Sequence, residues 1–112
     1  FLSGLDEEIY RVDFDLEGCS NYAFPLVLKD PNFPFRDKLE NHMQLNGIEF
    51  RRGNAGGGNQ MRQPYLKGIV KKNDWENYPE VEHIHHFGWY IGNFPGLEEE
   101  KILKLCEILN NV

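Results

Sequence analysis

Two helical segments, each with one apolar face, constrain the fold of this chain most. In segment 35–45, Phe35, Leu39 and Met43 recur every four residues and share one face of a helix. A second apolar stripe follows segment 97–109 and consists of Ile102, Leu105, Cys106 and Leu109. Each stripe must be buried against another element, so the chain has to supply a partner surface for both helices.

Both helices have recognisable ends. Asn46 and Gly47 end the first helix, because glycine readily adopts the left-handed conformation of a C-terminal cap. Glutamates at 98–100 complement the positive end of the second helix dipole. Glu100 and Lys104 are spaced to form an i, i+4 ion pair worth about 0.3 kcal/mol.

Three short segments, 22–28, 48–52 and 87–91, have the composition of strands and can provide the partner surface. Pro25 places the first of them at a sheet edge or a bulge, because proline cannot donate to the ladder. Residues 80–86 favour a further short helix. The order of elements predicts an α+β fold, in which a small antiparallel or mixed sheet of about three strands packs against two main helices.

The acidic start of the chain differs in composition from the rest. Residues 1–19 are interpreted as an N-terminal arm or linker, and residues 20–112 as one domain. Between 10 and 16 apolar and charged residues nearly alternate, which permits an edge strand or an extended arm. Segment 30–34 predicts a turn. Because the chain opens with Phe rather than Met, we expect it to be part of a longer protein.

Composition narrows the class of function. The chain has 112 residues, enough for one modest core, and a net charge of −6. That charge disfavours general nucleic-acid binding, which needs a basic surface. No apolar run approaches the roughly 18 residues of a membrane span. Cys19 and Cys106 stand outside any C-x-x-C pattern, which favours buried thiols in a reducing compartment, so we expect a cytoplasmic protein.

The stretch 47–64 is the most informative for function. It runs from a strand-like start into a glycine-rich segment that contains Arg51, Arg52 and Arg62. Glycine lets the backbone approach a ligand closely, and arginine offers forked donors for phosphate or carboxylate. The spacing matches neither a Walker loop nor a dinucleotide fingerprint. The stretch is therefore either a flexible surface loop or a loop that binds an anion or another polar ligand, and the bracketing arginines favour the ligand loop.

The histidines near the third strand invite comparison with a metal site. His83, His85 and His86 have no Cys or paired acidic ligand close by in the sequence, whereas structural zinc sites use four ligands at recognisable spacing. Partly buried imidazoles are therefore favoured, and no metal is predicted. The sequence also has no nucleophile elbow and no paired-carboxylate motif, so no catalytic residue is predicted.

Aromatic residues add two open questions. Trp75 lies in the polar and irregular region 64–82, where it either anchors the loop or faces a ligand. Trp89 and Tyr90 are neighbours on a predicted strand and therefore point to opposite faces. At least one of them is expected to pack in the core.

Four segments together resemble a known family. They are Ser20-Asn-Tyr-Ala-Phe-Pro-Leu26, Gly47-Ile-Glu-Phe-Arg51, Gly58-Asn-x-x-Arg-Gln-Pro-Tyr65, and His86-Phe-Gly-Trp-Tyr-Ile-Gly-Asn-Phe-Pro-Gly-Leu97. This order resembles the C-terminal domain of DegT-type sugar aminotransferases, pyridoxal-phosphate (PLP) enzymes of aminotransferase fold type I that act on nucleotide-linked 4-keto sugars. It is most similar to the branch with the 4-keto-6-deoxysugar 3-dehydratases. The chain departs from that branch at Arg52, where proline is common, and at Gly56-Gly57.

The resemblance implies a site that this chain completes rather than contains. The Schiff-base lysine, or the histidine of the dehydratases, and the PLP-binding residues lie in the large domain of the family. Lys67, Lys71 and Lys72 are therefore not assigned to that role. The resemblance implies a nucleotide-sugar substrate, PLP in the parent enzyme, a missing large domain as partner, and a homodimeric parent, with transamination or 3-dehydration of the sugar as its reaction.

The resemblance also implies which residues contact the substrate. They are Arg51, Gly58, Asn59, Arg62 and Gln63, with the arginines for charged or hydroxyl-rich groups and the amides for sugar hydroxyls. The alternative is a free-standing module that binds a nucleotide sugar or another anion without catalysis.

Overall fold

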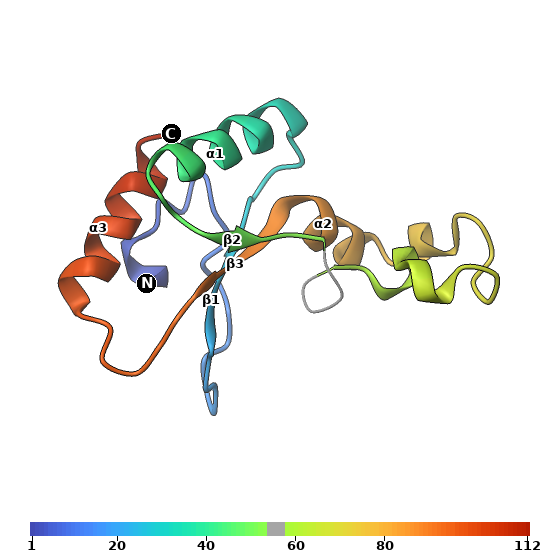
Figure 1. The fold of residues 1–112 in the computed structure, drawn as a ribbon, viewed down its shortest axis with the longest axis horizontal. Helices are drawn as coiled ribbons and strands as arrows, with labels where there is room; N and C mark the ends of the chain where they lie inside the picture. The colour runs from blue at the N-terminus through green and yellow to red at the C-terminus, as the bar shows by residue number, and fades with distance from the viewer. Residues whose placement is uncertain (54–57) are drawn as a thin grey trace.

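The protein folds into a small α+β unit (Figure 1). The computed structural model describes residues 1–53 and 58–112. Within them the sheet consists of three strands, β1 (Ala23–Val27), β2 (Phe50–Arg51) and β3 (Gly88–Gly92). The α-helices of the described residues are α1 (Phe33–Leu45), α2 (Pro79–Phe87) and α3 (Glu99–Asn110). The predicted α+β fold with three strands is confirmed, and every strand pair is antiparallel.

The central strand is the last one in the sequence. The order of the sheet is β1-β3-β2, so β3 pairs on both sides and β1 and β2 form the edges. Leu26 of β1 lies opposite Trp89 of β3, and Arg51 of β2 lies opposite Tyr90. The edge position of β1 confirms the prediction made from Pro25, because an edge strand tolerates a residue without an N–H.

Helix α1 begins earlier than the apolar spacing predicts. Its first residue is Phe33 rather than Phe35, and the side chain of Asn32 accepts a hydrogen bond of 2.9 Å from the amide of Phe35. Pro34 lies in the first turn, where the missing N–H leaves no helical bond unmade. The predicted turn at 30–34 is therefore shorter, because the asparagine cap and the proline start the helix at residue 33.

Strand β2 is shorter than the predicted strand at 48–52. Gly47 has a φ of +70°, and the amide of Ile48 donates to the carbonyl of Met43 over 2.9 Å. Ile48 is therefore held by the end of α1. The paired part of the strand starts only at Phe50, two residues later.

The last helix also differs in detail from its prediction. It begins at Glu99 rather than Leu97, because the amide of Leu97 closes a turn onto the carbonyl of Phe94 at 3.2 Å. Lys104 forms its ion pair with Glu107, at 3.0 Å, and not with the expected Glu100. Glu107 lies in the turn after Lys104, whereas Glu100 lies in the turn before it. The i, i+3 spacing serves a helix surface as well as i, i+4 does.

The beginning of the predicted acidic arm is part of the core. Leu5 and Tyr10 are buried, and Phe1 and Leu2 pack against the same apolar cluster. The Tyr10 hydroxyl donates to the carbonyl of Leu109 over 2.5 Å, and burial raises the pKa of this phenol. Tyr10 also forms a single antiparallel bridge with Leu28, in place of the permitted edge strand. Residues 13–20 are exposed.

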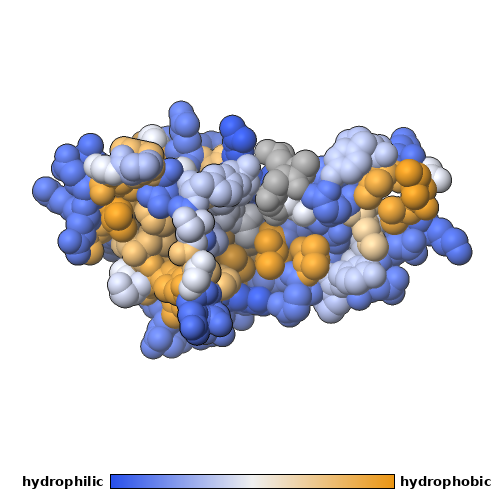
Figure 2. Space-filling model, turned by 90° about the horizontal axis from the view of Figure 1, so that it is seen from below, coloured by the Kyte–Doolittle hydropathy of each residue, from blue (hydrophilic) through white to orange (hydrophobic). Residues whose placement is uncertain are grey.

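Two regions of the molecule differ in how they are held together. We call residues 1–53 and 79–112 the body and residues 58–78 the side lobe; the lobe extends beyond α2 in Figure 1. The body contains the apolar core between the sheet, α1 and α3. Among the described residues of the side lobe, Asn59 is the one that is buried. From below, Figure 2 shows hydrophobic residues gathered under the body and again towards the end of the lobe.

Candidate functional site

The side lobe consists of short 3-10 turns rather than long elements. They are η2 (Gln60–Arg62), η3 (Pro64–Leu66) and η4 (Asp74–Asn77). Asn59 caps the first of them, since its side-chain oxygen accepts from the amide of Met61 at 3.1 Å. The backbone hydrogen bonds of these turns are short-range, such as that from the amide of Leu66 to the carbonyl of Gln63 at 3.1 Å, and α2 supplies the contacts that join the lobe to the body.

Glu82 of α2 fastens the side lobe to the body. Its Oε1 accepts from Nδ2 of Asn59 at 2.8 Å and from Nε of Arg62 at 2.7 Å. Its Oε2 accepts from Nη2 of Arg62, also at 2.7 Å. The hydrogen bond with Arg62 holds the pKa of Glu82 below its usual value, and the carboxylate raises the pKa of Arg62. This is the bidentate geometry that favours arginine over lysine.

His85 makes a second connection between helix α2 and the lobe. Its Nδ1 accepts a hydrogen bond of 3.0 Å from the backbone amide of Asn59, which requires an unprotonated Nδ1. Burial lowers the pKa of His85, and the nearby His86 and Arg62 lower it further. His85 therefore fits its position as a neutral imidazole.

The other two histidines of α2 are also half-buried and engaged. Nε2 of His83 lies 2.7 Å from the carbonyl of Leu28, and Nε2 of His86 lies 3.6 Å from Oε2 of Glu82. Across residues 1–53 and 58–112, no group of three or more His, Cys, Asp or Glu side chains could hold a metal ion. The interpretation as partly buried imidazoles agrees with these contacts.

The position of Trp75 shows whether it anchors the loop or is available to a ligand, a question that the sequence leaves open. The guanidinium carbon of Arg62 lies 4.7 Å from the centroid of its ring, in cation–π contact. Trp75 therefore anchors the lobe through Arg62. It also lines a pocket of about 510 Å³, so both roles considered for it are compatible.

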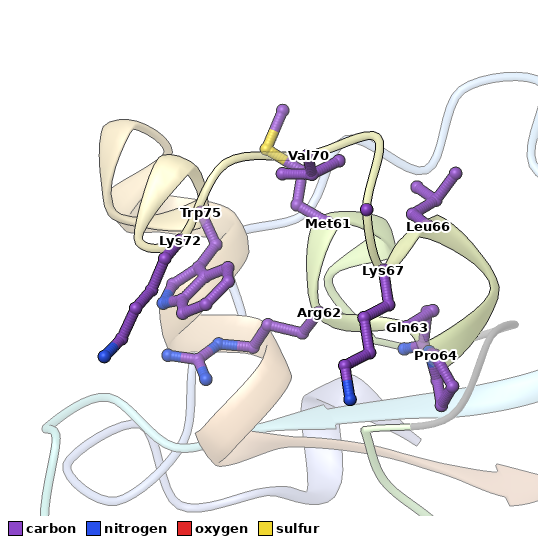
Figure 3. Close-up of a pocket in the computed structure, with 10 residues that line it drawn as sticks. Met61, Arg62, Gln63, Pro64, Leu66, Lys67, Val70, Lys72 and Trp75 are labelled. Carbon is purple, nitrogen blue, oxygen red and sulfur yellow. The ribbon is translucent and has the colours of Figure 1, made fainter.

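The pocket of the side lobe has an apolar part and a cationic part (Figure 3). Its lining residues with apolar side chains are Met61, Pro64, Leu66, Val70 and Trp75. The charged ends of Arg62, Lys67 and Lys72 extend to the same side of the view in Figure 3. No Asp or Glu is among the described residues that line this pocket.

The predicted substrate residues fall into two groups. Asn59, Arg62 and Gln63, preceded by Gly58, lie together at the joint between the lobe and α2. Nε2 of Gln63 donates to the carbonyls of Gly53 and Asn59 at 3.1 and 3.3 Å.

Arg51 lies elsewhere, exposed on strand β2. It lines a smaller pocket of about 280 Å³ together with Tyr22 and Tyr90, and this pocket shares none of its described residues with that of the lobe. The predicted departure at Gly56-Gly57 lies outside the described residues. The structure thus brings four of the five predicted residues to one place.

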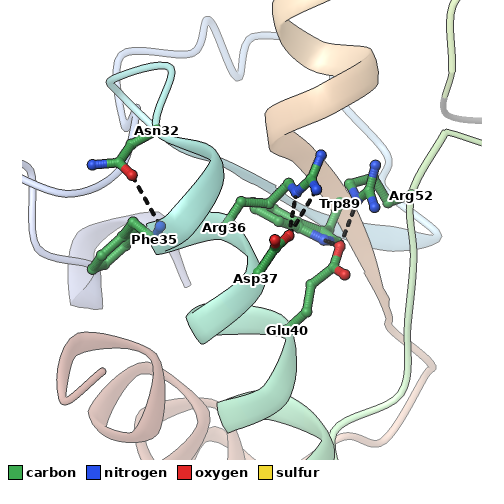
Figure 4. A network of polar contacts seen from close by, with 7 residues as sticks. All are labelled: Asn32, Phe35, Arg36, Asp37, Glu40, Arg52 and Trp89. Carbon is green, nitrogen blue, oxygen red and sulfur yellow. Dashed lines mark hydrogen bonds and ion pairs between the residues drawn. The ribbon is translucent and has the colours of Figure 1, made fainter.

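Arg52, the departure from the resembled branch, has a structural role. Its Nε lies 2.5 Å from Oε1 of Glu40 on α1, and the same oxygen accepts from Nε1 of Trp89 at 2.8 Å (Figure 4). Trp89 is only 3% exposed, whereas Tyr90 is half-buried. The expectation that one of these two aromatics packs in the core is confirmed.

The cysteines agree only partly with the expectation of buried thiols. Cys106 is buried in α3, and burial raises the pKa of its thiol, which makes it a poor nucleophile. Cys19 is exposed, because residues 13–20 do not join the core. Neither is in a disulfide.

Sequence reasoning missed Glu82 and the lysines of the pocket. Glu82 is one of two glutamates in the first turn of α2, and Lys67 and Lys72 lie in a region without periodicity. The signal that could have indicated Glu82 is that Arg62 needs an acidic partner and that the nearby helix offers two glutamates in its first turn.

No family model, no curated protein and no solved structure matches the chain. In the part of the chain that the structure describes, none of the helices is both long and apolar enough to cross a membrane.

Proposed function

We propose that this chain is the small domain of a PLP-dependent enzyme that transaminates or 3-dehydrates a nucleotide-linked 4-keto-deoxysugar. One observation supports this proposal most. The four segments that carry the resemblance, although dispersed over 20–97, are assembled in one unit. Three of them contribute strands β1, β2 and β3 to the same sheet, and the fourth is fastened to α2, directly before β3.

The joint between the lobe and α2 supplies the groups for substrate binding. Arg62 uses Nε and Nη2 for Glu82, and within the described residues its Nη1 has no hydrogen-bond partner. The bidentate bond to Glu82 fixes the orientation of the guanidinium, so Nη1 can meet an anionic or hydroxyl group with little loss of entropy. Asn59 is 3% exposed, and its side chain bonds to Glu82 and to the amide of Met61, so it positions the Glu82–Arg62 pair rather than contacting the sugar.

The chemical step itself belongs to the missing large domain. PLP supplies an electron sink there when it is bound. The residues of this chain hold and orient the nucleotide sugar at the wall of that site. We further propose that the parent enzyme is a cytoplasmic homodimer, as the resemblance implies.

The second candidate is a free-standing module that binds a nucleotide sugar or another anion. The cationic pocket of the side lobe favours it, because such a pocket can bind a ligand without a catalytic partner.

The coding sequence upstream of Phe1 distinguishes the two candidates. We expect several hundred further residues that include a PLP-site lysine or histidine. A start codon directly ahead of Phe1, or turnover of a 4-keto sugar nucleotide by the isolated 112-residue chain, would overturn the proposal.

Two arginines that both pair with glutamates of α2 provide a matched test in the parent enzyme. Replacing Arg62 by alanine should raise the KM for the sugar nucleotide by roughly tenfold, the effect of about 1.4 kcal/mol. Arg11 pairs with Glu80 at 2.8 Å and has the same side-chain exposure, 30%, but lies in the body. Arg11→Ala should leave KM unchanged, and equal effects of both replacements would argue against a substrate role of Arg62.

A further inference from the structure

The pocket of the side lobe contains cations that its own fold does not use. Arg62 is neutralised by Glu82, but within the described residues Lys67 and Lys72 have no ion-pair partner. The chain as a whole carries a net charge of −6, so two lysines at one pocket, without an acidic partner among the described residues, give this pocket the opposite sign of charge to the whole chain. A pocket with this arrangement attracts an anion and lowers the competition from positive ligands.

The apolar wall suits a ligand that is more than a simple anion. Leu66, Val70 and the ring of Trp75 line the same pocket, and Met61 and Pro64 extend this wall. An inorganic anion would gain nothing from that surface, because it is strongly hydrated. A flat, weakly hydrated group joined to a compact double charge fits both parts of the pocket, and a nucleotide has this composition.

The size of the pocket agrees with such an occupant. Its volume of about 510 Å³ lies within the roughly 300–1,000 Å³ that is usual for sites of drug-sized ligands, whereas the pocket beside Arg51 has only about 280 Å³. Trp75 is held in position by the cation–π contact with Arg62, and Arg62 is held by Glu82. The aromatic surface is therefore oriented before a ligand arrives, which lowers the entropy lost on binding.

We propose that this pocket is the nucleoside-diphosphate subsite, with Lys67 and Lys72 on the diphosphate and Trp75 and Leu66 against the base. This inference rests on the proposed function, since it assigns one part of the nucleotide sugar to the lobe. The sugar then extends towards the joint at Arg62 and Gln63. Lys67 and Lys72 thus act as binding residues, although the resemblance assigns them no role.

Binding to the 112-residue chain can be measured directly by calorimetry with UDP, CDP, GDP and dTDP as probes. We expect at least one of them to bind at least tenfold more tightly than pyrophosphate or the corresponding nucleoside. Trp75 fluorescence gives an independent signal, because the other tryptophan, Trp89, is buried in the body. Equal binding of pyrophosphate would overturn the inference, and so would no binding of any nucleoside diphosphate.

Matched lysine variants test the assignment of the charges. The double replacement Lys67→Ala/Lys72→Ala should weaken nucleotide binding at least tenfold, and the control Lys38→Ala/Lys101→Ala, at exposed positions on α1 and α3, should not. Equal binding by both double variants would overturn the inference. If the parent enzyme turns over its sugar nucleotide with an unchanged KM in the Lys67→Ala/Lys72→Ala form, the inference fails while the proposed function stands. Upstream sequence without a PLP site would instead remove the proposed function.

Discussion

The body and the side lobe are held together by different interactions. The body buries an apolar cluster in which the N-terminal residues, the sheet, α1 and α3 all take part. The side lobe buries a single polar residue among those described, and its fold depends on Glu82 and His85 of α2. Hydrophobic burial scales with area and is insensitive to pH, whereas a few charged hydrogen bonds depend on particular groups and their protonation.

This difference assigns separate tasks to the two regions. A region with an apolar core has high local stability and serves as a scaffold, whereas a region with few buried contacts opens at lower free energy. Lys67 and Lys72 of the lobe take no part in an apolar core, and under the proposed function they serve a ligand. The following changes should therefore affect the two regions separately.

The largest effect is expected from a cavity in the body. Leu39 of α1 is fully buried, so Leu39→Ala should lower the free energy of unfolding by about 2–5 kcal/mol through lost burial and an unfilled cavity. Leu45 lies on the same helix at 78% exposure, and Leu45→Ala should change the stability by less than about 0.5 kcal/mol. Urea denaturation measures both values, and similar losses would contradict the position of the core.

A smaller and local effect is expected at the joint of the lobe. Glu82→Gln replaces a carboxylate that accepts three hydrogen bonds by a group whose NH₂ faces Arg62. The attachment of the lobe should weaken by about 1.5–3 kcal/mol, seen as faster hydrogen exchange at Asn59 and Met61.

The body should keep its exchange rates in this variant. Glu80→Gln is the matched control, because Glu80 lies on the same helix and pairs with Arg11 at an exposed position. It should leave the exchange of the lobe unchanged. If Glu82→Gln accelerated exchange in neither region, or accelerated both alike, the separation of lobe and body would be wrong.

Acid should loosen the lobe before the body, to a smaller extent than Glu82→Gln. The pKa of His85 is lowered from its usual 6.5, so on acidification the unfolded chain takes up the proton first. Stability is therefore complete above about pH 6.5 and is lost as the pH falls towards the pKa of the folded state. A proton on Nδ1 also removes the acceptor for the amide of Asn59.

Nuclear magnetic resonance of the Asn59 amide tests this dependence. Its protection should be constant above about pH 6.5 and fall as the pH drops below that value, because the pKa of His85 is lowered in the folded state. His85→Asn should flatten the profile, and His42→Gln, in the body on α1, should keep it. Glu82 contributes in a separate window, since its lowered pKa places its loss below the usual 4.5. Constant protection as the pH falls below about 6.5 would contradict the role of His85.

The smallest effect is expected on the surface of α3. Lys104 and Glu107 pair at 3.0 Å with side-chain exposures of 65% and 62%. Lys104→Ala should lower the free energy of unfolding of the body by about 0.3 kcal/mol, because water screens such a pair. The loss should shrink further at high salt, and a loss above about 1 kcal/mol would show that surface charge contributes more than expected.

The sequence predicts those parts of the fold that depend on neighbours in the chain. The apolar spacing of Leu39 and Met43 and the stripe of α3 are local patterns, so both helices lie where they are expected within two residues. Pro25 predicts an edge strand because the ladder excludes proline from the centre. For the candidate site, the resemblance implies Arg51, Gly58, Asn59, Arg62 and Gln63, and the last four lie within one short segment.

Contacts between distant residues are not accessible in this way. Tyr10 binds Leu109 across 99 positions of sequence, so composition alone makes the start of the chain look like an arm. The acidic partners of Arg52 and Arg62, Glu40 and Glu82, lie on helices that other segments place there. The charges of these arginines look free for a ligand until their partners are known.

By itself, the sequence determined the helices and strands to within two residues and the edge position of β1. Tertiary structure decided that Arg51 stands apart from Arg62, and that Lys67, Lys72 and Trp75 share one pocket. The physical reason is the range of the interactions. Helical spacing, caps and proline act within a few residues, whereas ion pairs, pockets and the core depend on which distant segments the sheet brings together.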